Sequence, residues 1–264
     1  MTNSIPEFLG EKDLQLLLIH DLFSDQSAWN AQLEFFARHV NICNFPLSGH
    51  PGSPEWNQTA TRSYLAENRN RLEQLVRTVD RLSIIAHGHS AKLALELASN
   101  FPDKVENLIL LSPVLSPHAL MSGLPRFLPF FYEMFFVFAD TLGEKGPSLR
   151  RPFDRLGTLP APAARKWVDD WRRQMPVDFG MIRARTLILA GDRLPRLPDP
   201  PVSEINENLP NSHLIRYAGL GHGLHIESPT TVNPVLLDFL LRPEGFFQKG
   251  LESFFGFIKG ILSK

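Results

Sequence analysis

Residues 82–98 read LSIIAHGHSAKLALELA, and this stretch decides the fold. A short apolar run, 82–86, is broken by His87 and Gly88, and leucines then recur along the rest of the segment. The pattern predicts a buried strand that turns sharply into a helix, with Ser90 at the corner. A serine at such a corner is exposed at the end of a sheet, and its hydroxyl stands clear of neighbours, as a nucleophile requires. The same serine also suits a simple helix cap before Ala91, so the corner alone leaves both interpretations open.

Short apolar runs alternate with helical patterns along most of the chain. The runs are residues 14–19, 40–45, 82–86, 108–111, 186–190 and 213–217. This alternation predicts an α/β fold, a mostly parallel sheet flanked by helices on both faces. No convincing strand appears in residues 116–181, a phenylalanine-rich segment that we interpret as an inserted helical lid. We therefore expect a core of residues 1–115 and 182–243, a lid of residues 116–181, and a tail of residues 244–264.

Composition narrows the range of functions. The 264 residues are 43% hydrophobic, enough for one large core. Because 27 basic residues balance 28 acidic ones and form no basic block, nucleic acid is not an expected partner. No apolar stretch approaches the ~20 residues of a membrane span, and the first residues lack the pattern of a secretory signal. We expect a cytoplasmic protein without a cofactor, and without a metal because its histidines lack ligand spacing with carboxylates on one helical face.

Five segments, taken in order, resemble motifs of the α/β-hydrolase superfamily. They are LLLIHDLFSDQSAW (16–29), FPLSGHPGS (45–53), GHSAK (88–92), TLILAGDRL (186–194) and GLGHGLHIESP (219–229). They resemble, respectively, the first-strand His-Gly motif, the Asp-x-x-Gly-His-Gly-x-Ser loop, the Gly-x-Ser-x-Gly nucleophile elbow, the segment that carries the acid, and the Gly-His that carries the catalytic histidine. The resemblance extends from about Leu14 to Leu241, and the order serine, acid, histidine is the one this family uses.

The resemblance implies roles for individual residues. Ser90 matches the nucleophile, and His222 matches the general base that takes its proton. The backbone amides of Ala91 and Leu22 match the oxyanion hole, which stabilises charge that appears only in the transition state. The other histidines near these motifs are expected to be hydrogen-bonded scaffold residues: His20, His87, His89 and His225.

Five positions depart from the family pattern. Pro46 and Pro51 replace an aspartate and a glycine of the second motif, and the other three lie near the expected chemistry. Asp21 replaces a glycine, which places a carboxylate beside a site that should bind an oxyanion. Lys92 replaces the second glycine of the elbow, and we expect its ammonium to point to solvent. Leu194 occupies the place of the acid, with Asp192 and Asp199 nearby. Three interpretations stay open: Asp192 or Asp199 reaches the histidine through a rearranged loop, the site works as a Ser-His dyad, or catalysis has been lost.

The tail of the chain, residues 244–264, predicts an amphipathic helix. At about 100° per residue, its apolar side chains fill one half of the helical wheel. They are Phe247, Leu251, Phe254, Phe255, Phe257, Ile258, Ile261 and Leu262. Lys249 and Lys259 lie on the opposite half with small and polar residues. Such a helix packs on the main domain, on a second copy of the chain, or on a membrane surface.

Two functions follow from these patterns. The first is a serine hydrolase that cleaves a carboxylic ester with an apolar acyl group, because the phenylalanine-rich lid suits an apolar pocket. The second is a catalytically impaired, hydrolase-like protein that binds an apolar ligand, a partner or a membrane surface. Asp21, Lys92 and Leu194 favour the second interpretation, whereas the presence of both Ser90 and His222 favours the first. The sequence does not specify which ester is cleaved.

Overall fold

The computed structural model describes residues 8, 13–21, 24–50, 53, 63–115, 166, 169–170, 177–192 and 200–241. Its centre is a six-stranded sheet with the order β2-β1-β3-β4-β5-β6, and all neighbouring strands are parallel. The strands are β1 (Gln15–Ile19), β2 (Asn41–Phe45), β3 (Leu82–His87), β4 (Val105–Leu111), β5 (Arg185–Gly191) and β6 (Ser212–Tyr217). Each predicted apolar run falls in one of these strands, so the predicted parallel sheet is confirmed.

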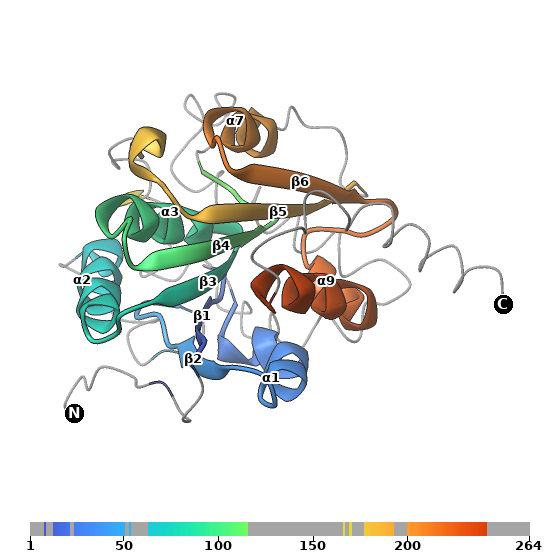
Figure 1. The fold of residues 1–264 in the computed structure, drawn as a ribbon, viewed down its shortest axis with the longest axis horizontal. Helices are drawn as coiled ribbons and strands as arrows, with labels where there is room; N and C mark the ends of the chain where they lie inside the picture. Colours follow the sequence, from blue (N-terminus) through green and yellow to red (C-terminus); the bar gives the residue numbers. More distant parts are fainter. Residues whose placement is uncertain are drawn as a thin grey trace, which may run out of the picture.

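Helices cover both faces of the sheet (Figure 1). One face packs against α2 (Tyr64–Arg77), α3 (Ala91–Asn100) and α7 (Pro200–Asn208). The other packs against α1 (Asn30–Phe36) and α9 (Pro229–Leu241). Short helical turns complete the described part of the chain: η1 (Gln26–Trp29), η2 (Gly88–Ser90), η5 (Phe179–Met181) and α8 (Leu224–Glu227).

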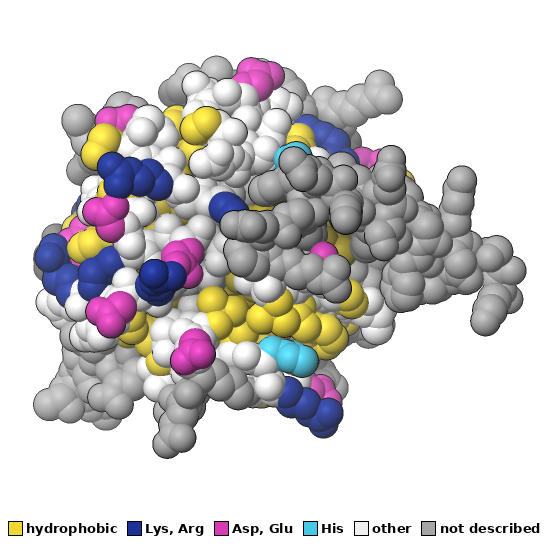
Figure 2. Space-filling view, viewed as in Figure 1, with side chains coloured by type: hydrophobic (Ala, Val, Ile, Leu, Met, Phe, Trp, Pro, Cys, Tyr) yellow, Lys and Arg dark blue, Asp and Glu magenta, His cyan; other side chains and the backbone are white. Residues whose placement is uncertain are grey.

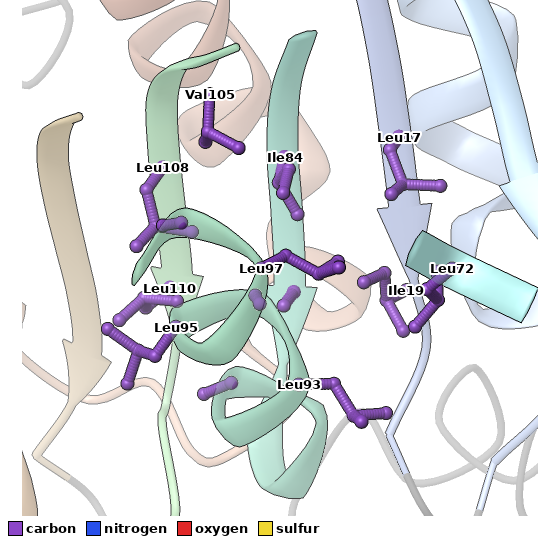
Figure 3. Packing of buried hydrophobic residues seen from close by; sticks show 14 of the residues in the cluster. Leu17, Ile19, Leu72, Ile84, Leu93, Leu95, Leu97, Val105, Leu108 and Leu110 are labelled. Carbon is purple, nitrogen blue, oxygen red and sulfur yellow. The ribbon is translucent and has the colours of Figure 1, made fainter. Parts of the chain in front are cut away.

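The helix after the elbow is anchored by leucines that recur along its length. Leu93, Leu95 and Leu97 of α3 are 0–2% exposed and lie over the central strands (Figure 3). On the strands, Ile84 and Leu108 are fully buried in the same cluster. Each such side chain contributes about 1.5–3 kcal/mol by leaving water. This packing holds the start of α3, and therefore the elbow, rigidly on the sheet.

The strand order also determines where a site can form. The chain places β2 on one side of β1 and then β3 to β6 on the other, so the order reverses between β1 and β3. In open parallel sheets, ligands bind outside the carboxyl ends of the strands at such a switch point. Here the loops after β1 and β3 meet at that edge, and they carry Asp21 and Ser90.

Lys92 does not point to solvent, so that expectation was wrong. Its side chain is 8% exposed, and its Nζ lies 4.0 Å from Glu96 Oε1. Arg69 of α2 binds the same carboxylate in a fork, with contacts of 2.8 and 3.0 Å. Burial lowers the pKa of Lys92. The lysine is accommodated because a carboxylate one turn further along α3 receives it. Figure 2 shows acidic and basic side chains interspersed on the surface at the left of the view.

Two predicted segments fall largely or wholly outside the described residues. Of the lid, residues 116–181, the structure describes only 166, 169–170 and 177–181, and it describes none of the tail, residues 244–264. Both segments therefore stay predictions. Within the described residues, no helix combines the length and the apolar character needed to cross a membrane.

Candidate active site

The strand-to-helix corner is present, but its serine is not exposed. The positive φ of the turn, +57°, falls on Gly88, whereas Ser90 has ordinary helical angles. Ser90 is 3% exposed, and its Oγ donates a hydrogen bond of 2.6 Å to the carbonyl oxygen of His20. The expected freestanding hydroxyl was therefore wrong. The loop after β1 lies against the corner, and its backbone accepts the hydrogen bond of the serine hydroxyl.

Of the two predicted oxyanion amides, the structure describes that of Ala91 and not that of Leu22. The N–H of Ala91 donates within the turn, to the carbonyl oxygens of Gly88 and His89. Leu22 lies outside the described residues. An oxyanion formed at Ser90 would therefore have to compete with the turn for the Ala91 N–H. The assignment of these two amides stays a prediction.

Asp21 is the centre of the site. Its carboxylate is 2% exposed and accepts hydrogen bonds at 2.9 Å from both the backbone N and the ring Nδ1 of His89. Its second oxygen, Oδ2, lies 3.1 Å from His222 Nε2. The carboxylate also fills the space beside Gly88, where an added Cβ would lie 2.4 Å from it. Gly88 is thus required both by its backbone angle and by the close approach of Asp21.

The charge of Asp21 is set by its neighbours. Burial alone would raise the pKa of this carboxyl group, but the charge of His89 and the hydrogen bonds from His222 and His89 outweigh burial. Together they hold the pKa of Asp21 well below its usual value. A carboxylate in this state only accepts hydrogen bonds, so His222 Nε2 must donate to it. Sequence reasoning noted Asp21 as a departure but missed it as the partner of His222, because no local spacing links positions 201 residues apart.

His222 is held by a loop that several contacts brace. The backbone N of Gly221 donates to Glu227 Oε1 at 3.0 Å, and His87 Nε2 lies 3.1 Å from the carbonyl oxygen of His222. Asp192, the predicted acid, accepts a hydrogen bond of 2.7 Å from the backbone N of Gly219. The carboxylate of Asp192 therefore braces the loop, whereas the imidazole of His222 contacts the carboxylate of Asp21. Asp199 and Leu194 lie outside the described residues, and the assignment of an acid stays a prediction.

Buried aromatic rings extend inward from His222. The ring centroid of His87 lies 4.5 Å from those of both His222 and His225, and Trp29 lies 4.6 Å from His225. Burial lowers the pKa of His87 to about 3 and that of His225 well below its usual value. His225 was expected to be a hydrogen-bonded scaffold residue, which was wrong. Among the described residues, neither of its ring nitrogens has a hydrogen-bond partner. The ring is held by its contacts with Trp29 and His87, and Gln32 donates to the backbone carbonyl of His225.

His20 does act as the expected scaffold. Its Nδ1 donates to the carbonyl oxygen of Asp21 at 2.9 Å, and its Nε2 accepts from the backbone N of Leu47 at 3.4 Å. This pair of contacts requires the neutral ring. Accordingly, burial and the neighbouring His50 lower the pKa of His20 to about 3. A neutral His20 therefore fixes the loop that carries both Asp21 and the acceptor of Ser90.

One group of side chains has the chemistry of a metal site. Asp21, His87 and His222 each offer one ligand atom, and these atoms lie within 4.8 Å of one another. Two histidines and a carboxylate are a ligand set for ferrous iron or zinc. The expected absence of a metal rested only on ligand spacing along one helix, whereas the residues of this group come from three segments that are distant in the sequence. Ligand atoms around one zinc ion lie about 3.4 Å apart, so holding an ion would require this group to contract.

Comparisons with known proteins agree on the architecture. The model of a family described as the alpha/beta hydrolase family matches residues 16–235. A thermophilic esterase from Thermogutta terrifontis superposes with a TM-score of 0.71 at 17% identity, covering 87% of this chain and 90% of that one. A hydrolase from Oleispira antarctica gives 0.69 at 19% identity, with 89% and 94% covered. A membrane phospholipase A, described as a bacterial virulence factor, gives 0.69 at 22% identity, with 89% and 80% covered.

At these identities the structural matches establish the fold alone. No curated protein matches the sequence significantly.

Proposed function

Because this chain belongs to the alpha/beta hydrolase family, we propose that it is a serine hydrolase that cleaves carboxylic esters with an apolar acyl group. The observation that supports the proposal best is the gathering of the reactive groups around residues 20–21. Ser90 donates to the carbonyl oxygen of His20, and His222 contacts the carboxylate of Asp21. The residues that we propose as nucleophile and base are therefore both in contact with residues 20–21, at the switch point of the sheet.

The proposed reaction has two halves. Ser90 Oγ attacks the ester carbonyl while His222 accepts its proton, and the imidazolium then protonates the departing alcohol oxygen as the C–O bond breaks. A water molecule, deprotonated by His222, then attacks the acyl group on Ser90. As the bond between the acyl carbon and Ser90 Oγ breaks, His222 returns that proton to Oγ and the carboxylic acid is released. The amides of Ala91 and Leu22 are the proposed oxyanion donors, and Asp192 is the proposed acid. For this reaction the Ser90 hydroxyl must leave the carbonyl of His20.

The proposed preference for an apolar acyl group comes from residues 116–181. Six of the eight phenylalanines in this segment gather between positions 127 and 138, where they suit the lining of an apolar pocket: Phe127, Phe130, Phe131, Phe135, Phe136 and Phe138. Two of the superposed proteins are an esterase and a membrane phospholipase A, whose names agree with a substrate of this kind. The substrate class is thus proposed as small or lipid-derived esters.

Ser90→Ala is expected to abolish covalent labelling by a fluorophosphonate probe and hydrolysis of p-nitrophenyl acyl esters. In a serine protease, removing the nucleophile lowers kcat on the order of a millionfold, so the variant should give only background. Ser112→Ala is the matched control, because Ser112 follows β4 at the same edge and its Oγ has no hydrogen-bond partner among the residues that the structure describes. Parent and control should label equally. A folded parent protein that neither labels nor hydrolyses any chain length would contradict the proposal.

A second candidate function, binding without catalysis, is favoured by one specific arrangement. His222 contacts the carboxylate of Asp21, and the Ser90 hydroxyl donates to the carbonyl oxygen of His20. The Ala91 amide donates within its own turn. Under this alternative the fold presents an apolar ligand site with no turnover. The labelling experiment separates the two functions, because a binding protein retains long-chain fatty acids or esters in equilibrium dialysis yet never reacts with the probe.

We propose further that residues 244–264 attach the protein peripherally to a membrane surface from the cytoplasm. The apolar half of the predicted helix would lie among the acyl chains, with Lys249 and Lys259 near anionic headgroups. The full-length protein is expected to sediment with vesicles containing anionic phospholipid, whereas a variant lacking residues 244–264 should stay in the supernatant. If the full-length protein ignores vesicles but forms dimers that the truncation abolishes, the tail mediates self-association instead.

A further inference from the structure

The contact between Asp21 and His222 has a direct consequence for the proposed activity. We propose that Asp21 is a latch, which holds His222 by the ring nitrogen that must accept the Ser90 proton and keeps the site in a closed resting state. The proposal rests on the proposed function, since a latch has meaning only where His222 serves as a base. Asp21 is thus a positioning residue that acts through His222.

The first step is the protonation state of the contact. Asp21 Oδ2 lies 3.1 Å from His222 Nε2, and an ionised carboxylate can only accept a hydrogen bond. Nε2 therefore carries the proton in this arrangement and has no lone pair for the serine. Consistent with this, Ser90 donates to the carbonyl oxygen of His20. Neither partner of the expected serine–histidine hydrogen bond is placed for proton transfer.

Second, the contact between Asp21 and His222 is stable because the carboxylate is buried and held by His89. The carboxylate is 2% exposed, and His89 binds its other oxygen through both the backbone N and the ring Nδ1 at 2.9 Å. Charge-assisted bonds of this kind are about twice as strong as neutral ones. The low pKa of Asp21 agrees with a carboxylate that stays ionised through the physiological range. The latch is therefore fixed on the elbow side by His89 and engages His222 with its remaining oxygen.

Third, the negative charge of Asp21 lies close to the proposed oxyanion hole. Asp21 comes directly before Leu22, whose amide is a proposed oxyanion donor, and its carboxylate touches the space beside Gly88 of the elbow. A negative charge there opposes the negative charge that forms on the substrate carbonyl in the transition state. The carboxylate thus hinders the reaction twice, by occupying the base and by repelling the oxyanion.

The test replaces Asp21 and reads two signals. Asp21→Gly removes the side chain, and Asp21→Asn keeps its shape while removing its charge. Asp25→Asn is the matched control, because Asp25 lies in the same loop, caps η1 and can still do so as asparagine. We expect the fluorophosphonate labelling rate to rise at least tenfold in Asp21→Gly, to rise less in Asp21→Asn, and to stay unchanged in Asp25→Asn.

The second signal does not depend on activity. In protein with ¹⁵N-labelled histidines, the Nε2–H of His222 should give a downfield proton resonance, identified by its loss in His222→Gln. The resonance should persist in Asp25→Asn and vanish in Asp21→Gly. Its absence from the folded parent would overturn the proposed contact directly.

The two readouts separate failure of the latch from failure of the proposed function. If the parent labels at Ser90 and both Asp21 variants, folded by circular dichroism, label no faster, the latch is wrong and the hydrolase stands. If the resonance behaves as expected but no variant labels or hydrolyses esters, the hydrolase is wrong, and the latch falls with it because there is no base to restrain.

Discussion

The free energy of unfolding is expected to fall by about 4 kcal/mol for each pH unit between about pH 6 and about pH 4, because three buried histidines stay neutral in the folded protein over this range. These are His20, His87 and His225, each with 0% exposure. Burial lowers the pKa of His20 and His87 to about 3, and that of His225 well below 6.5. In the unfolded chain each ring titrates near 6.5. The unfolded state therefore binds more protons below that pH, and acid favours unfolding.

The size of the effect follows from linkage. A group that is protonated only in the unfolded state changes stability by 1.36 kcal/mol per pH unit, so three such groups give about 4. Asp21 does not contribute in this window. Its pKa is lowered from 3.8, so its stabilisation is lost only as the pH falls below that value. For a domain of typical stability, about 5–15 kcal/mol, unfolding should begin well above pH 3.

The measurement is urea unfolding at a series of pH values between 4 and 7. His225→Phe removes one titrating ring whose nitrogens have no hydrogen-bond partner in the part of the chain that the structure describes. The slope should therefore flatten by about 1.4 kcal/mol per pH unit whatever the absolute stability. His39→Gln is the control, because His39 is exposed and should leave the slope unchanged. A slope in the parent below about 1 kcal/mol per pH unit would show that these rings protonate without unfolding.

The fold could be predicted because its signals are local. Each strand is a short apolar run, and burial of both sheet faces explains why the runs are continuous. Only their ends moved: β4 begins at Val105, three residues before the predicted run, because Val105 pairs with Leu82 across a register shift. The alternation of runs and helical patterns was sufficient to predict a parallel sheet.

The site could be predicted only as far as motif order allows. Ser90 and His222 could be placed at the carboxyl edge of the sheet, because they follow β3 and β6 of one parallel sheet. The contact of His222 with Asp21 could not be predicted, since it depends on how three loops pack above that edge. Likewise, Lys92 was expected in solvent because the sequence does not show that Arg69 of another helix helps to hold Glu96 beside it. The hydrophobic periodicity of a sequence therefore predicts strands and helices, but not which polar side chains from distant segments contact each other.

Gly191→Ala is expected to destabilise the protein by about 3 kcal/mol or more and to displace the loop that carries His222. Gly191 ends β5, and an added Cβ would lie 2.0 Å from the carbonyl oxygen of Leu220 and 2.5 Å from that of Gly221. Both neighbours are backbone atoms, so no side chain can turn away. The backbone of residues 220–221 must move, and His222 is the next residue.

Gly219→Ala provides the matched control in the same loop. Gly219 has a φ of +75°, and an added Cβ would have no atom within 4 Å. Its substitution should therefore cost only the backbone strain of a left-handed alanine, about 1–2 kcal/mol. Urea unfolding compares the two variants, and the His222 Nε2–H resonance reports on the loop, lost in Gly191→Ala and retained in Gly219→Ala. Equal costs, with the resonance intact in both, would mean that residues 220–221 yield freely and that the approach of Gly191 does not position His222.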